Sequence, residues 1–219
     1  MPKAKEQLIS FLRKSMGYYP IILDLAGKKC LIVGGGLVAL RKAQSLLEAG
    51  AMATVVSPGI CAELECLDGV VLHRRAYEPG DIDGCTLVFA ATDDPSVNAA
   101  VSHDAAEHGI LANVVDDPEL CSFIVPATCR RGDLLISVTT SGKSPALSKH
   151  IREQLEQAYG PEYEPFVNLL GEVREVIKSQ YSCRAEREAA FNRLISSGIL
   201  ELLRDGKDEQ AREMAQRCI

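Results

Sequence analysis

The feature that most constrains this chain is a run of three glycines between a short apolar segment and a segment of helical periodicity. Residues 31–33 predict a buried strand, and residues 37–49 repeat apolar side chains at helical spacing. Gly34, Gly36 and Ala39 match the G-x-G-x-x-G/A spacing of dinucleotide-binding turns. Gly34 allows a tight turn, and Gly36 lets the backbone approach a pyrophosphate because glycine has no Cβ. The alternative, a turn whose glycines serve packing alone, is disfavoured by the flanking strand and helix.

Apolar segments of strand length alternate with helical segments as far as residue 116. The predicted strands cover residues 31–33, 53–56, 70–73, 86–91 and 111–115, and the predicted helices cover 37–49, 58–67 and 95–108. Ser57-Pro58 predicts the start of the second helix, with Ser57 as its N-cap. This alternation predicts an α/β fold of the Rossmann type, a parallel sheet with helices on both faces. Residues 4–15 predict a further helix and residues 19–25 a further strand before the glycine turn.

The pattern of the chain changes after Asp116. Residues 122–126 and 134–139 predict two antiparallel strands, because a polar turn at 130–133 and no long helix separates them. From Pro145 onward only helical periodicity remains. The sequence therefore predicts a dinucleotide-binding domain at residues 1–116, a small α+β segment at 117–150 and an all-helical tail at 151–219.

Charge and hydropathy exclude several classes of protein. The net charge is −6 and the isoelectric point is about 5.3, which argues against a general binder of nucleic acid or of membrane surfaces. No apolar run approaches the roughly 20 residues that span a bilayer. Glu6 and Arg13 interrupt any signal-peptide core. These features predict a soluble, cytoplasmic protein.

The chain has eight cysteines and four histidines, but they lack the spacing of a metal site. No C-x-x-C pair is present, so we predict neither a structural zinc site nor a disulfide framework. Cys30 and Cys85 lie at the edges of apolar segments and are interpreted as buried free thiols. His103 and His108 are five residues apart and do not share a helix face well. We therefore predict no metal-binding residues.

Polar residues follow the predicted strands at their carboxyl ends, where open α/β sheets bind ligands. Thr92 follows residues 86–91 as a candidate cofactor contact, and Asp94 is a candidate helix cap. The acidic residue that binds the ribose in many NAD enzymes is missing, because its expected position falls at Ser57-Pro58-Gly59. Ser57 either binds a ribose hydroxyl or caps the following helix. The residues therefore leave the choice between NAD and NADP open.

Asp116 follows the last predicted strand and would project into the same crevice. A carboxylate there can act as a base or engage a cation. The alternative is a turn residue before Pro118, where aspartate is common. Position alone does not decide between these two interpretations.

The segment at residues 139–145 combines hydroxyls, a glycine and Lys143 immediately before a predicted helix, which suits an anion. Ser144 also fits the N-cap of that helix, with Pro145 behind it. Lys149, His150 and Arg152 place further positive charge on the same helix. They indicate an anionic substrate or, alternatively, a solvated basic helix face.

Several of these segments together resemble the precorrin-2 dehydrogenase family, the dehydrogenase and ferrochelatase module of sirohaem synthase. The resemblance covers residues 18–150 in order, and from residue 160 the chain is similar only in being helical. The segments that carry it are Pro20-Ile21, Cys30–Ala43, Val55–Pro58, Ala90–Pro95, Asn113–Asp117, Cys121–Pro126 and Ser141–Pro145.

The resemblance implies NAD-dependent oxidation of precorrin-2 to sirohydrochlorin, and in many relatives also insertion of ferrous iron (Fe2+) to give sirohaem. Asp116 matches an aspartate implicated in both reactions, since each must remove protons from the macrocycle. Ser144 matches an active-site serine, and Ser141 and Lys143 would hold substrate carboxylates. The residues that would contact NAD are Gly34, Gly36, Leu37, Val38, Ser57, Pro58, Gly59 and Thr92.

The resemblance also implies a homodimer whose second domain is built from both chains, with the exchange around residues 122–139. Two alternatives to the dehydrogenase stay open. One is a sirohydrochlorin chelatase that performs no oxidation. The other is a regulator that binds NAD or a tetrapyrrole and catalyses nothing.

Overall fold

The computed structural model describes residues 17–219. The helix predicted at residues 4–15 lies outside them. The strand predicted at residues 19–25 is wrong, because this segment pairs with no strand of the described chain. Tyr19, Ile21 and Ile22 are exposed, and only Leu25 packs into a core. No helix within residues 17–219 has both the length and the apolar character needed to cross a membrane.

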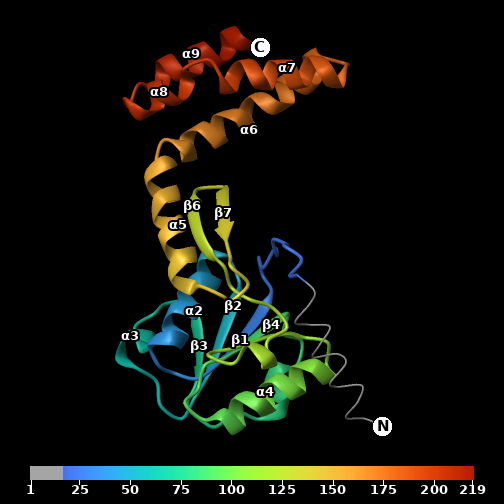
Figure 1. The fold of residues 1–219 in the computed structure, drawn as a ribbon, viewed down its shortest axis with the longest axis vertical. Helices are drawn as coiled ribbons and strands as arrows, with labels where there is room; N and C mark the ends of the chain where they lie inside the picture. Colours follow the sequence, from blue (N-terminus) through green and yellow to red (C-terminus); the bar gives the residue numbers. More distant parts are fainter. Residues whose placement is uncertain (1–16) are drawn as a thin grey trace. The chain divides into compact units, whose positions relative to one another are not determined.

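The predicted parallel sheet is confirmed, with five strands in the order β3-β2-β1-β4-β5 (Figure 1). Its strands are β1 (Lys29–Val33), β2 (Met52–Val56), β3 (Val70–His73), β4 (Leu87–Ala90) and β5 (Leu111–Val114). All four pairings are parallel. The chain places β2 and β3 on one side of β1 and then crosses to β4 and β5 on the other, which is the doubly wound arrangement.

Helices cover both faces of this sheet. Successive residues of a strand point to opposite faces, and here the residues on both faces are apolar. Cys30 and Ile32 face α2 (Leu37–Glu48), which contributes Ala39, Ala43 and Leu46 to the first core. The second core lies on the opposite face, where Leu31 and Val33 share a cluster with Val101 and Ala105 of α4 (Pro95–Glu107). The remaining short elements are α3 (Ala62–Glu65) and the 3-10 helices η1 (Pro79–Ile82) and η2 (Pro118–Leu120).

The loop between β3 and β4 is fastened by two polar contacts. Arg75 makes a two-pronged ion pair with Asp81, with one nitrogen–oxygen distance of 2.8 Å. The Tyr77 hydroxyl donates a hydrogen bond of 2.8 Å to Asp104 on α4. The hydrogen bond from Arg75 holds the pKa of the Asp81 carboxyl below its usual value.

Replacing Asp81 with Asn is therefore expected to lower the urea concentration at which the protein unfolds near neutral pH. The ion pair's contribution is complete above the usual carboxyl pKa of about 4 and is lost as the pH falls through the lowered value. Urea midpoints at neutral and acidic pH should thus show a gap between wild type and variant that closes in acid. The exposed neighbour Asp83, changed to Asn, is the control. A gap independent of pH would contradict the assignment.

The chain divides into two compact units, and the boundary in the sequence lies between Val125 and Pro126. Residues 117–125 belong to the first unit, because the Ser122 hydroxyl bonds to the Ala112 backbone and Phe123 packs edge-on against Phe89. The second unit combines a two-stranded sheet with five helices. This division differs from the three segments expected from sequence, with boundaries at residues 116 and 150.

The two-stranded sheet is antiparallel, as predicted, but its first strand was placed wrongly. The strands are β6 (Ala127–Arg131) and β7 (Leu134–Val138), with Arg131 opposite Leu134. The turn between the strands is therefore only two residues long. Gly132 suits such a tight hairpin turn, since it adopts a φ of +55°. Residues 122–125, where that strand was expected, form no strand and belong to the first unit.

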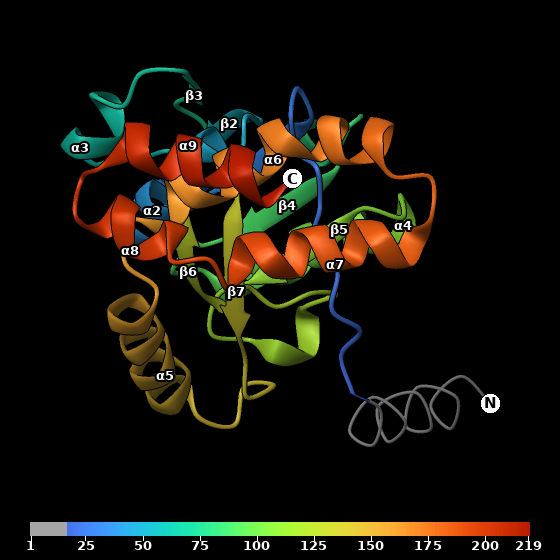
Figure 2. The same ribbon diagram turned by 90° about the horizontal axis from the view of Figure 1, so that it is seen from above.

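The helices of the second unit agree with the predicted periodicity. They are α5 (Pro145–Ala158), α6 (Tyr163–Gln180), α7 (Arg184–Ile195), α8 (Ile199–Arg204) and α9 (Asp208–Cys218). The four helices α6 to α9 pack around one core, which Figures 1 and 2 show from two directions. Phe166, Leu169, Val173 and Ile177 form the buried face of α6. The fold class is thus confirmed: a Rossmann-type unit followed by a small α+β region and a helical tail.

Candidate functional site

The strands of the parallel sheet end together at one edge. Val33 of β1 lies opposite both Val56 of β2 and Ala90 of β4, and Ala90 lies opposite Val114 of β5. The direction in which strands are added reverses between β1 and β4, and ligands of open α/β sheets bind at such a switch point. The segments that follow these four strands contain all the candidate site residues of the first unit.

At two of the three glycine positions, the backbone of another segment packs too closely to leave room for a Cβ. Gly34 has a φ of +123°, and a Cβ there would lie 2.2 Å from the carbonyl oxygen of Ala91. A Cβ on Gly35 would lie 2.0 Å from the carbonyl oxygen of Gly59. The Gly35 carbonyl also accepts a hydrogen bond of 2.8 Å from the Cys61 amide. The role of Gly35 was missed, because the dinucleotide spacing leaves that position unspecified.

Gly36 differs from its neighbours, because a Cβ there would meet no atom of the described chain within 4 Å. It is the N-cap of α2, and no side chain among residues 17–219 caps that helix. The first turn of α2 also lacks an acidic residue, and Leu37 is 62% exposed. The amides at Leu37 and Val38 and the positive end of the helix dipole therefore suit an anion such as a pyrophosphate.

The segment Ser57-Pro58-Gly59 does not begin a helix, so that part of the sequence prediction is wrong. Helix α3 begins at Ala62, with Cys61 as its N-cap. The Ser57 hydroxyl instead donates a hydrogen bond of 2.7 Å to the Gly59 carbonyl, and Ser57 is only 8% exposed. This tight turn presses Gly59 against Gly35. Pro58 and Gly59 are exposed at the same edge of the sheet.

Thr92 is held in place by Asn98, a buried polar residue of α4. The Asn98 side chain accepts from the Thr92 amide at 3.2 Å and donates to the Thr92 carbonyl at 2.9 Å. Thr92 Oγ1 lies 2.8 Å from Asn98 Oδ1. Asp94 caps α4 by accepting from the Ser96 amide, as predicted. Asn98 was missed by sequence reasoning, although a lone Asn inside an otherwise apolar helix face was the available signal.

Asp116 is exposed and has a φ of +62°, a backbone conformation that few residues other than glycine adopt. Its carboxylate makes no hydrogen bond or ion pair with the described residues. The neighbouring Asp117 performs the turn role instead, because its side chain caps η2 by accepting from the Glu119 amide at 3.1 Å. The structure thus leaves Asp116 with a free carboxylate directly after β5, at the edge where Gly34 follows β1.

The other candidate residues lie in one loop of the second unit, before α5. Ser141 has a φ of +54° and Gly142 a φ of +80°. Ser144 is confirmed as the N-cap of α5, since its oxygen accepts from the Leu147 amide at 3.2 Å. Its hydroxyl hydrogen is not used by any residue in the described chain. Lys143 is exposed beside it, so this loop offers hydroxyl and ammonium donors.

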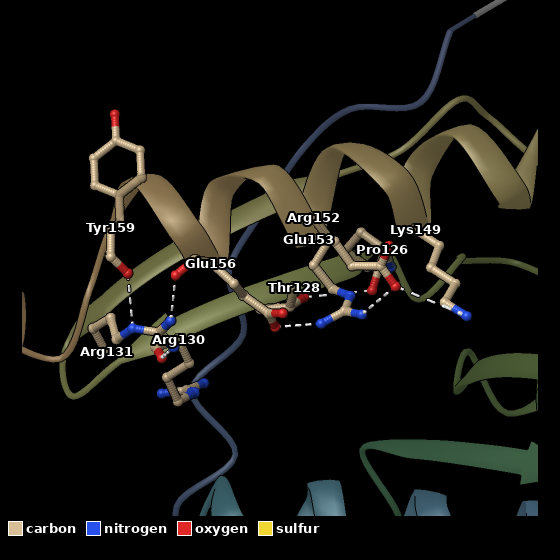
Figure 3. Close-up of polar contacts among 9 residues, drawn as sticks. All are labelled: Pro126, Thr128, Arg130, Arg131, Lys149, Arg152, Glu153, Glu156 and Tyr159. Atoms are coloured by element: carbon tan, nitrogen blue, oxygen red, sulfur yellow. Dashed lines mark hydrogen bonds and ion pairs between the residues drawn. The ribbon is translucent and has the colours of Figure 1, made fainter.

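The basic residues further along α5 are largely neutralised. Lys149 Nζ lies 3.9 Å from Glu153, and Arg152 pairs with both Glu153 and Glu156 (Figure 3). Arg131 is occupied as well, because it donates to the backbone carbonyls of Glu156 and Tyr159 at the end of α5. Lys149 and Arg152 therefore form paired charges of a helix face and add little to an anion site.

Helix α4 carries a partly exposed group of three possible metal ligands that the spacing of the histidines did not predict. His103 Nδ1 lies 3.7 Å from Asp104 and His103 Nε2 lies 3.8 Å from Glu107. These three side chains are close enough to hold a metal ion. Exposed carboxylates commonly approach a histidine without binding one, so the group assigns no function by itself.

Known proteins of sirohaem biosynthesis are similar to this chain. Residues 21–127 match a family described as putative NAD(P)-binding, and residues 131–158 match one described as sirohaem biosynthesis protein central. The chain is 39% identical over 210 residues to a siroheme synthase of Azotobacter vinelandii, covering 92% of this chain and 44% of that protein. It is 37% identical over 207 residues to one of Thioalkalivibrio sulfidiphilus, covering 93% and 42%. The chain thus spans less than half the length of these relatives.

A solved structure matches over its whole length. It is SirC, a precorrin-2 dehydrogenase, with a TM-score of 0.73 and 27% identity, covering 91% of this chain and 100% of that one. The relatives and this structure match across both compact units. Across both compact units the chain is therefore similar to a precorrin-2 dehydrogenase and to the corresponding part of siroheme synthases.

Proposed function

We propose that this chain oxidises precorrin-2 to sirohydrochlorin with NAD as the oxidant. The observation that carries this proposal is the end-to-end similarity to a precorrin-2 dehydrogenase. Two local features support it: the uncapped, open helix start at Gly36, and the free carboxylate of Asp116 at the same edge of the sheet. The reaction converts precorrin-2 and NAD+ into sirohydrochlorin, NADH and a proton.

In this proposal some of the candidate residues bind the cofactor or the substrate, and one transfers a proton. The amides at Gly36, Leu37 and Val38 would hold the dinucleotide pyrophosphate, with Ser57, Pro58, Gly59 and Thr92 along its length. Bound NAD supplies the acceptor for the hydride. Asp116 takes the proton that leaves the macrocycle as the hydride departs. Ser141, Lys143 and Ser144 would bind carboxylates at the rim of the tetrapyrrole.

The choice of NAD over NADP has one further support. A 2′-phosphate recruits free arginine or lysine near the ends of the second and third strands. Arg74 and Arg75 follow β3 at that edge, but Arg74 pairs with Glu65 and Arg75 pairs with Asp81. Both arginines are therefore already paired with carboxylates, which favours NAD, the cofactor without a 2′-phosphate.

We further propose that the chain inserts Fe2+ into sirohydrochlorin, where the metal replaces two pyrrole protons and Asp116 again serves as the base.

We also propose a homodimer. Within the described residues β6 and β7 pair only with each other, so each leaves an edge to which a second copy can add. A cytoplasmic location stays a prediction, supported by eight free thiols.

Anaerobic incubation of the purified protein with precorrin-2 and NAD+ is expected to give sirohydrochlorin and NADH in equal amounts. Absorption spectra recorded during the incubation measure both products. NADP+ should support the reaction about tenfold more slowly or worse. Fe2+ added after the oxidation is expected to convert the product into sirohaem faster than in a control without protein. Metal insertion without oxidation would instead establish the chelatase alternative. Binding of NAD without turnover would establish the regulator.

A further inference from the structure

The sulfur of Cys121 is the centre of a small network at the end of β5. It accepts a hydrogen bond from the Val114 amide at 3.1 Å. It also lies 3.2 Å from the carbonyl oxygens of Val114 and Asp117, and its hydrogen can go to either of them. The Asn113 side-chain amide approaches the same sulfur at 3.6 Å. One side chain therefore contacts the backbone on both sides of Asp116.

This network bears directly on the backbone conformation of Asp116. A φ of +62° lies in the left-handed region, which aspartate adopts more readily than most residues but which still depends on the contacts that hold the turn. The Val115 amide donates a hydrogen bond of 2.9 Å to the Ala90 carbonyl. Among the described residues, the only backbone hydrogen bond that closes the turn directly is a long one of 3.5 Å from the Asp117 amide to the Val114 carbonyl. The bridge through Cys121 closes the same turn with shorter contacts.

Cys121 is suited to this bridge because it remains a neutral thiol. It is half-buried against the second core, and burial raises its pKa. A neutral thiol both donates and accepts a hydrogen bond, whereas a thiolate could only accept. Alanine in its place would leave the Val114 amide and the Asp117 carbonyl without this partner.

We propose that Cys121 is a positioning residue for Asp116: it holds the turn at residues 114–117 so that the free carboxylate stays at the carboxyl edge of β5. The proposal rests on the proposed function, in which Asp116 moves the proton. In this role Cys121 itself contacts neither the cofactor nor the substrate.

The test is a double-mutant cycle of Cys121→Ala and Asp116→Asn, measured as single-turnover oxidation of precorrin-2 with excess protein. Cys121→Ala is expected to lower the rate about tenfold, with little change in the affinity for NAD+. Cys121→Ser, which keeps a donor and an acceptor, should recover part of that loss. In the Asp116→Asn background, Cys121→Ala should have no further effect on the rate, because there is no base left to position.

Cys85→Ala is the matched control, because Cys85 is also half-buried, packs against the same core and has a raised pKa. Both alanine variants should lower the urea midpoint to a similar degree, but only Cys121→Ala should slow turnover. Equal slowing in both Asp116 backgrounds, or equal slowing by Cys85→Ala, would overturn the positioning role. Those results would leave the proposed function intact. A wild-type protein that never oxidises precorrin-2 would instead overturn the proposed function.

Discussion

Replacing Asp116 with Asn is expected to lower the rate of precorrin-2 oxidation by a factor of about 10² to 10⁴, the usual contribution of a general base. Asparagine keeps the shape of the side chain and tolerates the same backbone conformation, but it cannot accept the proton. The affinity for NAD+ should stay unchanged, because the pyrophosphate site at Gly36 is a different segment. Stopped-flow absorption of NADH and an equilibrium titration with NAD+ measure the two quantities.

The matched control for this variant is Asp68→Asn. Asp68 is also exposed, but it lies in the turn before β3, at the opposite edge of the sheet. Its loss should leave the oxidation rate within experimental error. If Asp116→Asn retained the wild-type rate, the carboxylate would have no part in proton transfer. Another group would then have to be the base.

The three consecutive glycines are expected to respond very differently to the same substitution. Gly34→Ala should destabilise the protein by about 3 kcal/mol or more, because it combines a strained φ with a Cβ 2.2 Å from the Ala91 carbonyl. Gly35→Ala should be comparably harmful through its clash with Gly59. Gly36→Ala should cost about 1 kcal/mol or less, since its φ of −88° suits alanine and the space before it is open.

The effect on cofactor binding should run the opposite way. Gly36→Ala should fold normally yet bind NAD+ about tenfold more weakly or worse, because its Cβ enters the space where the pyrophosphate approaches. Urea unfolding gives the stability of each variant, and calorimetric titration gives its affinity. A Gly36→Ala variant with wild-type affinity would place the dinucleotide away from this helix start. Gly109→Ala, at a turn outside the site, controls for a general cost of removing a glycine with positive φ.

Some details of the site were predictable because they depend on residues adjacent in sequence. The capping of α4 by Asp94 and of α5 by Ser144 requires only a short polar side chain, a proline and a helix behind them. The Ser57-Pro58 pair has the same pattern and yet caps nothing. There the close approach of Gly59 to Gly35 imposes a tight turn instead, and no local rule contains that contact.

The apolar segment at residues 19–25 shows the same limit for strands. Its composition predicts a strand, but a strand exists only where another strand pairs with it, and none of the described residues does so. The hairpin was displaced for a related reason. Phe123 packs against Phe89 and Ser122 bonds to Ala112, so the chain remains on the first unit until Val125.

The sequence by itself determined the doubly wound α/β unit, the dinucleotide turn and the helical tail, because periodicity and glycine spacing are local properties. It also identified Asp116 as a candidate site residue, but it did not decide whether this residue acts as a base or as a turn residue. The tertiary structure gives the turn role to the neighbouring residue, and the role of Asp116 as a base stays a proposal. It assigns the cap of η2 to Asp117, it leaves the Asp116 carboxylate free, and it ties the turn to the sulfur of Cys121. Those contacts depend on the folding of residues 117–121 back onto the end of β5, which no local pattern specifies.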